Sequence, residues 1–363
     1  MKKILIIILT VFLTSVSIFA NEQNHENTGE AEHHEDAKSE KFQPGPFIFE
    51  HILNSHDWHI LTYNGHHVSI PLPVIVWSKY TGFHMFMSSK FEHGHAEYQG
   101  LRLSEEGDNK GKIIEAAPDG SVYLPIDISI SKNVLALFIS LIMLIWIFTT
   151  VAKKYTQNRN KAPTGIQNLM EPMILFIRDD VAKAAIGEKK YEKFMPYLLT
   201  IFFFIWLNNM MGIIPIFPGG YNLTGNITIT MVLALFTFVI TTINGNKAYW
   251  THIVNAPGVP WWLKIPIPLM PIVEIMGVFT KPFVLMVRLF ANMAAGHIIA
   301  LGFISLIFIF GNMSIAAGYG FSVVSVLFVV FMTILELLVA FIQAYVFTLL
   351  SALYFGMAIE EHH

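Results

Sequence analysis

The stretch KPFVLMVRLFANMAAGHIIAL, residues 281–301, decides how the rest of the chain is interpreted. It is apolar enough for a membrane-spanning helix, yet it contains Arg288 and His297. An arginine at the centre of such a helix costs about 2.5–3.5 kcal/mol on insertion scales, so it usually faces a partner or water and has a function. The alternative is an arginine that reaches the membrane surface from a helix end, and the position of Arg288 well inside the apolar stretch disfavours it.

The composition of the whole chain also indicates a membrane protein. Hydrophobic residues make up 54% of the 363 residues, charged residues 13%, and the mean hydropathy is +0.53. Residues 21–130 hold 17 acidic and 7 basic residues, whereas residues 152–193 hold nine basic and five acidic ones. The chain has no cysteine, which excludes disulfides, thiolate metal sites and thiol nucleophiles.

The first 45 residues are typical of an exported N-terminus. Residues 1–20 begin with two lysines after the Met, continue with an apolar core and end at Ala20, which predicts a secretory signal peptide. Because Ile18 is not small, an uncleaved anchor helix is the alternative. Residues 21–45 are rich in Glu, Asn and His and are predicted to be disordered.

Residues 46–130 differ in pattern from the N-terminal segment. Short apolar runs are broken by Gly, Pro and Asn, which predicts a small β-rich domain outside the membrane. Eleven of the fifteen histidines precede residue 96. His33 and His34 are therefore candidate zinc or copper ligands, although a solvated acidic tail is the simpler interpretation, and we expect no resident metal and no cofactor.

Residues 131–363 are predicted to be an all-α, multi-pass membrane domain. The five crossings are expected at residues 133–152, 195–216, 227–244, 271–310 and 321–358, with an amphipathic surface helix at 164–190 and a small-residue turn, GNMSIAAGYG, before the last crossing. At about 1.5 Å per residue each of the last two approaches 60 Å, so both must tilt, bend or project into water. Lys153 and Lys154 place the end of the first crossing in the cytoplasm, and five crossings then place the C-terminus there.

The polar residues of the fourth crossing fall on different faces. Glu274 lies fourteen residues before Arg288, about 320° around a helix at 100° per residue, so the two share nearly one face. Asn292 follows Arg288 by one turn, and His297 lies roughly 180° away. Arg288 and His297 are therefore expected to face different surroundings.

The fifth crossing adds Glu336 and Gln343, spaced i, i+7 on one face. With a turn near residue 315, an antiparallel hairpin places Gln343 level with Arg288, and Glu336 within about two residues of His297. An imidazole and a poorly hydrated carboxylate are suited to relay a proton. The alternative is a hydrogen-bonded pair that only holds the hairpin together.

Other function classes have little support in the sequence. There is no P-loop, HExxH or GxSxG motif, so we expect no enzyme activity of the chain alone, no bound nucleotide and no nucleic-acid partner. A secondary ion transporter would bury charges too, but no internal repeat is visible. A His-rich, metal-binding envelope protein with a membrane anchor would not explain the polar residues of the last hairpin.

Several motifs resemble one family of membrane proteins. RLFANMAAGH (288–297), LVAFIQAYVFTLLSALYFGMAIEEHH (338–363) and the earlier NITITMVLAL and MPIVEIMGVFTKP are similar to the a subunits of F-type ATP synthases, and the resemblance covers residues 162–363. It implies a stator subunit with two aqueous half-channels that carry protons to and from a rotating c-ring. It also implies c-ring proteolipids, b-type peripheral stalk subunits and the lipid bilayer as partners, and a bacterial inner membrane location with a periplasmic N-terminus.

The resemblance also implies roles for particular residues. Arg288 corresponds to the essential arginine that faces the ring carboxylates and prevents leak. The positions that match polar residues of the proton path are Glu274, Asn292, Gln343 and Asn209. His297 and Glu336 stand where some bacterial members have Glu and His in the reverse order, and His297 favours H⁺ over Na⁺ as the transported ion. Gly212 stands where many bacterial members have an acid.

Overall fold

The computed structural model describes two compact units. The described residues are 44–45, 54–63, 66–94, 96–104, 109–116, 121–157, 162–214, 219–221, 223–254 and 269–360. The first unit comprises Met1–Phe138, Ile214–Tyr221 and His297–Thr333, and the second comprises Ile139–Ile213, Asn222–Gly296 and Ile334–His363. The predicted signal peptide, and nearly all of the acidic segment that follows it, lie outside the described residues.

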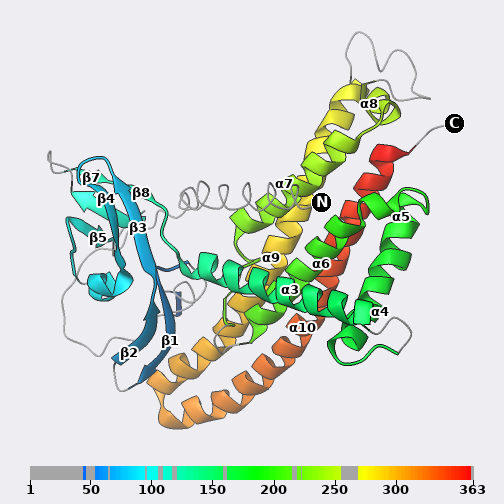
Figure 1. The fold of residues 1–363 in the computed structure, drawn as a ribbon. Helices are drawn as coiled ribbons and strands as arrows, with labels where there is room; N and C mark the ends of the chain where they lie inside the picture. Colours follow the sequence, from blue (N-terminus) through cyan, green and yellow to red (C-terminus); the bar gives the residue numbers. More distant parts are fainter. Residues whose placement is uncertain are drawn as a thin grey trace. The chain divides into compact units, whose positions relative to one another are not determined.

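The first unit contains the predicted β-rich region (Figure 1). Its described strands form three antiparallel sheets: β1 (Asp57–Tyr63) with β2 (His66–Pro71); β3 (Pro73–Ser78) between β4 (Gly82–Met87) and β8 (Ile126–Asp127); and β6 (Ile113–Ala116) between β5 (Leu101–Leu103) and β7 (Val122–Tyr123). A 3-10 segment, η1 (Ser88–Gly94), follows β4. The expectation of a β-rich N-terminal region is confirmed.

A small hydrophobic core holds two of these sheets together. Val74 and Val76 alternate along β3 toward one face and are fully buried. They pack with Phe91 of η1 and with Leu101 and Ile113 of the neighbouring sheet. One face of the β4-β3-β8 sheet therefore packs in the hydrophobic core, and the opposite face does not contribute to this core.

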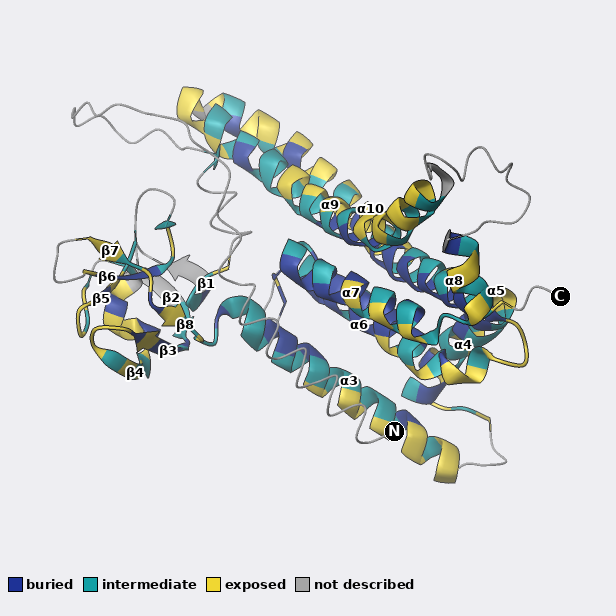
Figure 2. Cartoon of the chain, turned by 90° about the horizontal axis from the view of Figure 1, so that it is seen from above, coloured by how far each residue is buried: buried dark blue, intermediate teal, exposed yellow. Residues whose placement is uncertain are grey.

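Five described helices are long and apolar enough to cross a membrane, as the sequence predicts. They are α3 (Lys132–Gln157), α6 (Met195–Ile213), α7 (Ile227–Asn244), α9 (Leu269–Met313) and α10 (Ile315–Ile359). The last two have 45 residues each, about 68 Å at 1.5 Å per residue and more than twice a 30 Å hydrocarbon core. Figure 2 shows extensive exposed and partly exposed surface along both. The chain is thus a multi-pass membrane protein.

The turn between α9 and α10 is shorter than the sequence suggests. The predicted loop GNMSIAAGYG is almost wholly helical, and only Ser314 interrupts the two helices. Within the first unit the rings of Phe310 and Phe321 stack at 3.6 Å between centroids, which fixes an antiparallel hairpin. A Cβ built on Gly318 would lie 2.8 Å from the Cα of Gly311. The glycines thus allow close approach of two helices where an open loop was expected.

The predicted amphipathic segment is helical but not a uniform α-helix. It comprises α4 (Ile166–Phe176), a π-helical stretch η3 (Ile177–Lys183) and α5 (Ala184–Ile186). Asp179 forms ion pairs with Arg178 at 2.8 Å and Lys183 at 2.7 Å, and these hold the pKa of its carboxyl well below the usual range. The helix ends at Gly187, whose φ of 92° suits a residue without a side chain.

Candidate functional site

Arg288 lies near the middle of α9 and its side chain is exposed. Ala291, Asn292 and Ala295 are also exposed and share its face, at spacings of three, four and seven residues. Small residues on a membrane helix let another helix approach closely. The arrangement presents one permanent positive charge, with an amide beside it, on a surface suited to a helical partner.

The contact between Gly296 and Glu336 fixes the register of α9 and α10 within the second unit. A Cβ on Gly296 would lie 2.6 Å from Oε1 of Glu336. Eight residues back along α9 and seven forward along α10 lead to Arg288 and Gln343, which therefore lie at one level. Gln343 is only 7% exposed, so it faces the protein interior while Arg288 faces outward.

Glu336 and His297 differ in environment. Glu336 is 8% exposed, whereas His297 is half-buried. His297 begins the last segment of the first unit, and Glu336 belongs to the second. Their pairing, and a proton relay between them, stay predictions from the sequence.

Asn209 is fully buried and held by two hydrogen bonds in the second unit. Thr224 Oγ1 donates to Asn209 Oδ1 at 2.5 Å, and Asn209 Nδ2 donates to the carbonyl oxygen of Ala340 at 3.4 Å. Both Asn209 and Thr224 are 1% exposed. The side-chain amide of Asn209, a predicted proton-path residue, therefore links α6 to α10 and to the residues just before α7.

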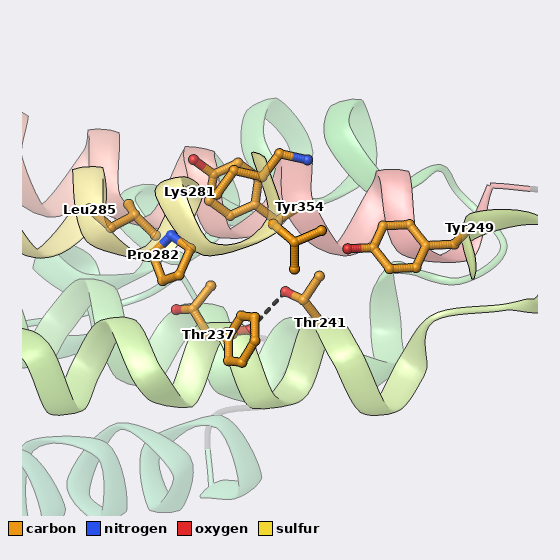
Figure 3. Close-up of a pocket in the computed structure, with 9 residues that line it drawn as sticks. Thr237, Thr241, Tyr249, Lys281, Pro282, Leu285 and Tyr354 are labelled. Carbon is orange, nitrogen blue, oxygen red and sulfur yellow. Dashed lines mark hydrogen bonds between the residues drawn. The ribbon is translucent and has the colours of Figure 1, made fainter. Parts of the chain in front are cut away.

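A small cavity lies among α7, α8 (Lys247–Val254), α9 and α10 in the second unit (Figure 3). Its volume of about 20 Å³ is close to the space of one water molecule. The polar side chains that line it are Thr237, Thr241, Tyr249, Lys281 and Tyr354. Hydroxyls, an ammonium group and phenols thus meet in an otherwise apolar part of the chain.

Glu274 belongs to the surroundings of this cavity. Its carboxylate lies within electrostatic range of Tyr249 and Lys281, both of which line the cavity. Burial raises the pKa of the Tyr249 phenol, and the negative charge of Glu274 raises it further. Lys281 Nζ lies 5.6 Å from the ring centre of Tyr354, near enough for a cation–π contact. The cavity is therefore lined by one cationic side chain, with an acidic side chain in electrostatic range of its lining.

Sequence reasoning missed most of this cavity. Among the residues in and around the cavity, the sequence predicts a function only for Glu274. A usable signal was the spacing of Thr237 and Thr241, two hydroxyls one helical turn apart in an apolar span. His33 and His34 lie outside the described residues, and the described part of the chain holds no group of three His, Asp or Glu side chains placed to bind a metal.

Comparisons with known proteins agree with these features. A family model described as "ATP synthase A chain" matches residues 134–356, and a model of a domain of unknown function matches residues 47–135. The ATP synthase subunit a of Chloroherpeton thalassium is 44% identical over 266 residues, which is 69% of this chain and 75% of that protein. The ATP synthase subunit a 2 of Chlorobaculum tepidum is 42% identical over 287 residues, which is 73% of this chain and 78% of that protein.

A third relative gives the same result. The ATP synthase subunit a of Myxococcus xanthus is 40% identical over 276 residues, covering 72% of this chain and 80% of that protein. The family model spans α6, α7 and the crossing within α9 fully, and almost all of α3 and α10. The chain belongs to the ATP synthase A chain family and is a proton-translocating membrane subunit of the ATP synthase complex.

Proposed function

We propose that the chain is the stator subunit that supplies two aqueous half-channels to a rotating c-ring, with Arg288 as the gate between them. The exposed position of Arg288 carries the proposal. An uncompensated guanidinium on an apolar helix is costly in lipid. A carboxylate on a neighbouring membrane subunit would compensate that charge, and the small residues beside Arg288 leave room for the helix that carries it.

The chemistry of arginine suits a gate rather than a proton carrier. A guanidinium stays charged in proteins, so it does not take part in proton transfer. A fixed positive charge lowers the pKa of a carboxyl that comes close to it, so the carboxyl gives up its proton there. The same charge repels a proton that would pass directly between the half-channels. Each proton driven by the membrane potential then supplies about 2.3 kcal/mol per 100 mV.

Two groups of polar side chains support separate proton paths. The cavity around Lys281 and Tyr354, with Glu274 near it, is our candidate for the cytoplasmic half-channel. Asn209, His297 and Glu336 belong to the proposed outer half-channel, where His297 and Glu336 would pass a proton between them. Gln343 lies at the level of Arg288 and Asn292 lies one turn from it. Both amides would hydrogen-bond the groups that transfer protons, without carrying charge themselves.

The remaining features of the assembly follow from this role. We propose a location in the bacterial inner membrane with the mature N-terminus in the periplasm and the C-terminus in the cytoplasm. The partners are c-ring proteolipids, b-type peripheral stalk subunits and lipid, and ATP chemistry takes place on other subunits. The proposed order along the chain is a signal peptide (1–20), an acidic segment (21–45), a periplasmic domain (46–130) and the channel domain (131–363).

The decisive experiment compares the complete complex with native Arg288 and with Arg288→Ala in inverted vesicles. ATP-driven proton uptake is followed by dye quenching, and passive proton flow is followed separately under an imposed potential. We expect Arg288→Ala to abolish pumping while passive flow is retained or raised. Arg102→Ala, which removes an exposed arginine from β5, is the matched control and should pump normally. Unaltered pumping by assembled Arg288→Ala complexes would refute the gate.

A further inference from the structure

The outer face of the β4-β3-β8 sheet is unusually apolar. Its six exposed side chains, which we call the apolar sheet face, are Trp77 (56% exposed), Phe83 (58%), Met85 (67%), Met87 (43%), Ile126 (57%) and Ile128 (51%). Single exposed apolar residues are common on soluble surfaces, but a contiguous apolar patch usually marks an interaction site.

Strand register shows that these side chains form one continuous surface. Trp77 pairs with Phe83 on β4 and with Ile126 on β8, and directly paired residues of antiparallel strands point to the same face. The N–H of Ile128 donates to the carbonyl oxygen of Ile75 at 2.9 Å, which continues the pairing beyond β8. The opposite face, with Val76, already fills the domain core.

The chain connects this face to a membrane helix with little slack. Ile130 N–H donates to Pro73 O at 3.0 Å, and Lys132 N–H, at the first residue of α3, donates to Ser55 O at 2.9 Å. Ile128 precedes Lys132 by four residues, a reach of at most about 14 Å. The apolar sheet face is therefore held close to the start of α3 by backbone hydrogen bonds.

The length of α3 places its start at the membrane surface. Its 26 residues extend about 39 Å, more than the 30 Å hydrocarbon core and close to the 40–45 Å of the whole bilayer. Lys132 therefore lies near the headgroups. Ile128, at most about 14 Å from Lys132 along the chain, is therefore close enough to contact the membrane interface.

The composition of the face fits a lipid interface. Tryptophan is enriched at the headgroup level of membranes, and Phe, Met and Ile suit the shallow acyl region below it. Residues 21–130 carry 17 acidic and 7 basic residues, yet the apolar sheet face contains no acid. Lys79, which follows Trp77 by two residues, is exposed and available to anionic headgroups.

We infer that the apolar sheet face inserts shallowly into the bilayer leaflet from which α3 starts, so that the β-rich region is a second, monotopic membrane anchor. The occupant is the phospholipid interface, because the same chain crosses that bilayer a few residues away. The inference is independent of the proton path and of the role of Arg288.

The test uses the full complex in lipid vesicles. Since the chain has no cysteine, Met85→Cys introduces a unique thiol in it for a fluorescent label. Arg102→Cys, also at an exposed strand position in the same unit, is the matched control. The parent complex treated with the same reagent gives the background from other subunits. Phe83→Cys repeats the measurement at a second position of the face.

The pattern of quenching shows whether lipid, water or a protein partner covers the apolar sheet face. We expect lipids with a nitroxide on a shallow acyl carbon to quench the labels at positions 85 and 83 several-fold more than the label at position 102. A water-soluble quencher should show the reverse order. Equal quenching at all three positions by the water-soluble agent would overturn the inference. Protection of positions 85 and 83 from both quenchers would also overturn it, because a protein partner would then cover the face.

Discussion

Thr224 donates a hydrogen bond of 2.5 Å to Asn209 within the protein interior, where both side chains are 1% exposed. Asn209 also donates to the carbonyl oxygen of Ala340 on α10. A buried amide is tolerated when its polar atoms are paired and is costly when they are not. Loss of the Thr224 hydroxyl should therefore destabilise the fold around Asn209.

Replacement of Thr224 tests this pair. Thr224→Val keeps the shape but removes the donor, which leaves Oδ1 of Asn209 without that bond and should cost about 1–3 kcal/mol of stability. Thr224→Ser keeps the hydroxyl and is the control. Thermal unfolding of the purified subunit, followed by intrinsic fluorescence, measures the difference. Equal midpoints for all three proteins would show that the bond contributes nothing.

Replacement of Gly296 tests the position of Glu336. In Gly296→Ala the new Cβ would lie 2.6 Å from Oε1 of Glu336, so the carboxylate must move. Because the carboxylate is the end of a flexible side chain, we expect little loss of stability but a clear loss of ATP-driven proton pumping.

Gly277→Ala is the control for that substitution, since no heavy atom lies within 4 Å of the Cβ that it would add. Both changes place alanine in α9, so effects on helix propensity are matched. Normal pumping by Gly296→Ala would show that the position of the Glu336 carboxylate does not limit proton transfer.

Replacement of Gly356 should affect stability instead. A Cβ at this position would overlap the backbone carbonyl of Ala185, which cannot move as a side chain can. We expect Gly356→Ala to cost about 1–3 kcal/mol and to loosen α10 from α5. Hydrogen exchange of residues 184–186 and 352–358 would report this loosening, and unchanged exchange would contradict it.

The hydrogen bond between His56 and Asp127 predicts a pH dependence in the β-rich region. His56 Nε2 lies 2.7 Å from Asp127 Oδ2. Burial raises the pKa of Asp127, but hydrogen bonds from His56 and Ser129 outweigh it and lower the pKa below its usual value. An unfolded Asp has a pKa of about 3.9, so this carboxylate stabilises the fold above that pH and loses its effect as the pH falls through the folded value.

Asp127→Asn measures this contribution. We expect faster proteolysis of the β-rich region at neutral pH, and a smaller change between pH 5 and pH 3 than in the parent. Asp57→Asn, also in the first unit, is the comparison. Identical acid profiles for the parent and Asp127→Asn would exclude the Asp127 carboxylate as the source of acid sensitivity.

Much of the architecture follows from the sequence, because length and hydropathy alone distinguish a membrane span. The five crossings were predictable in this way, and the β-rich region was predictable from its short apolar runs broken by Gly, Pro and Asn. The hairpin turn was not, because Gly311 and Gly318 usually indicate a loop. Here the same missing side chains instead allow two helices to meet.

Some residues of the candidate site are also predictable from the sequence, and others are not. Arg288 and Glu336 stand out as charges in apolar spans, and a single sequence is enough to find them. The cavity beside Glu274 needs contributions from α7, α8, α9 and α10, and no local pattern specifies which faces of these helices meet. That Arg288 faces outward while Gln343 faces inward at the same level also depends on packing.

The π-helical stretch Ile177–Lys183 has a consequence for how this chain can change. A π turn contains about one residue more than an α turn, so loss of one codon here would restore a regular helix without breaking its backbone ladder. Every later residue of that helix would rotate by about 100°. Within this stretch Val181 and Ala182 are buried, whereas Arg178 and Asp179 are partly exposed. The residues that rotate are Ala184, Ala185 and Ile186, which end the helix before Gly187. A single in-frame deletion can thus change which side chains of this helix end are buried in one mutational step.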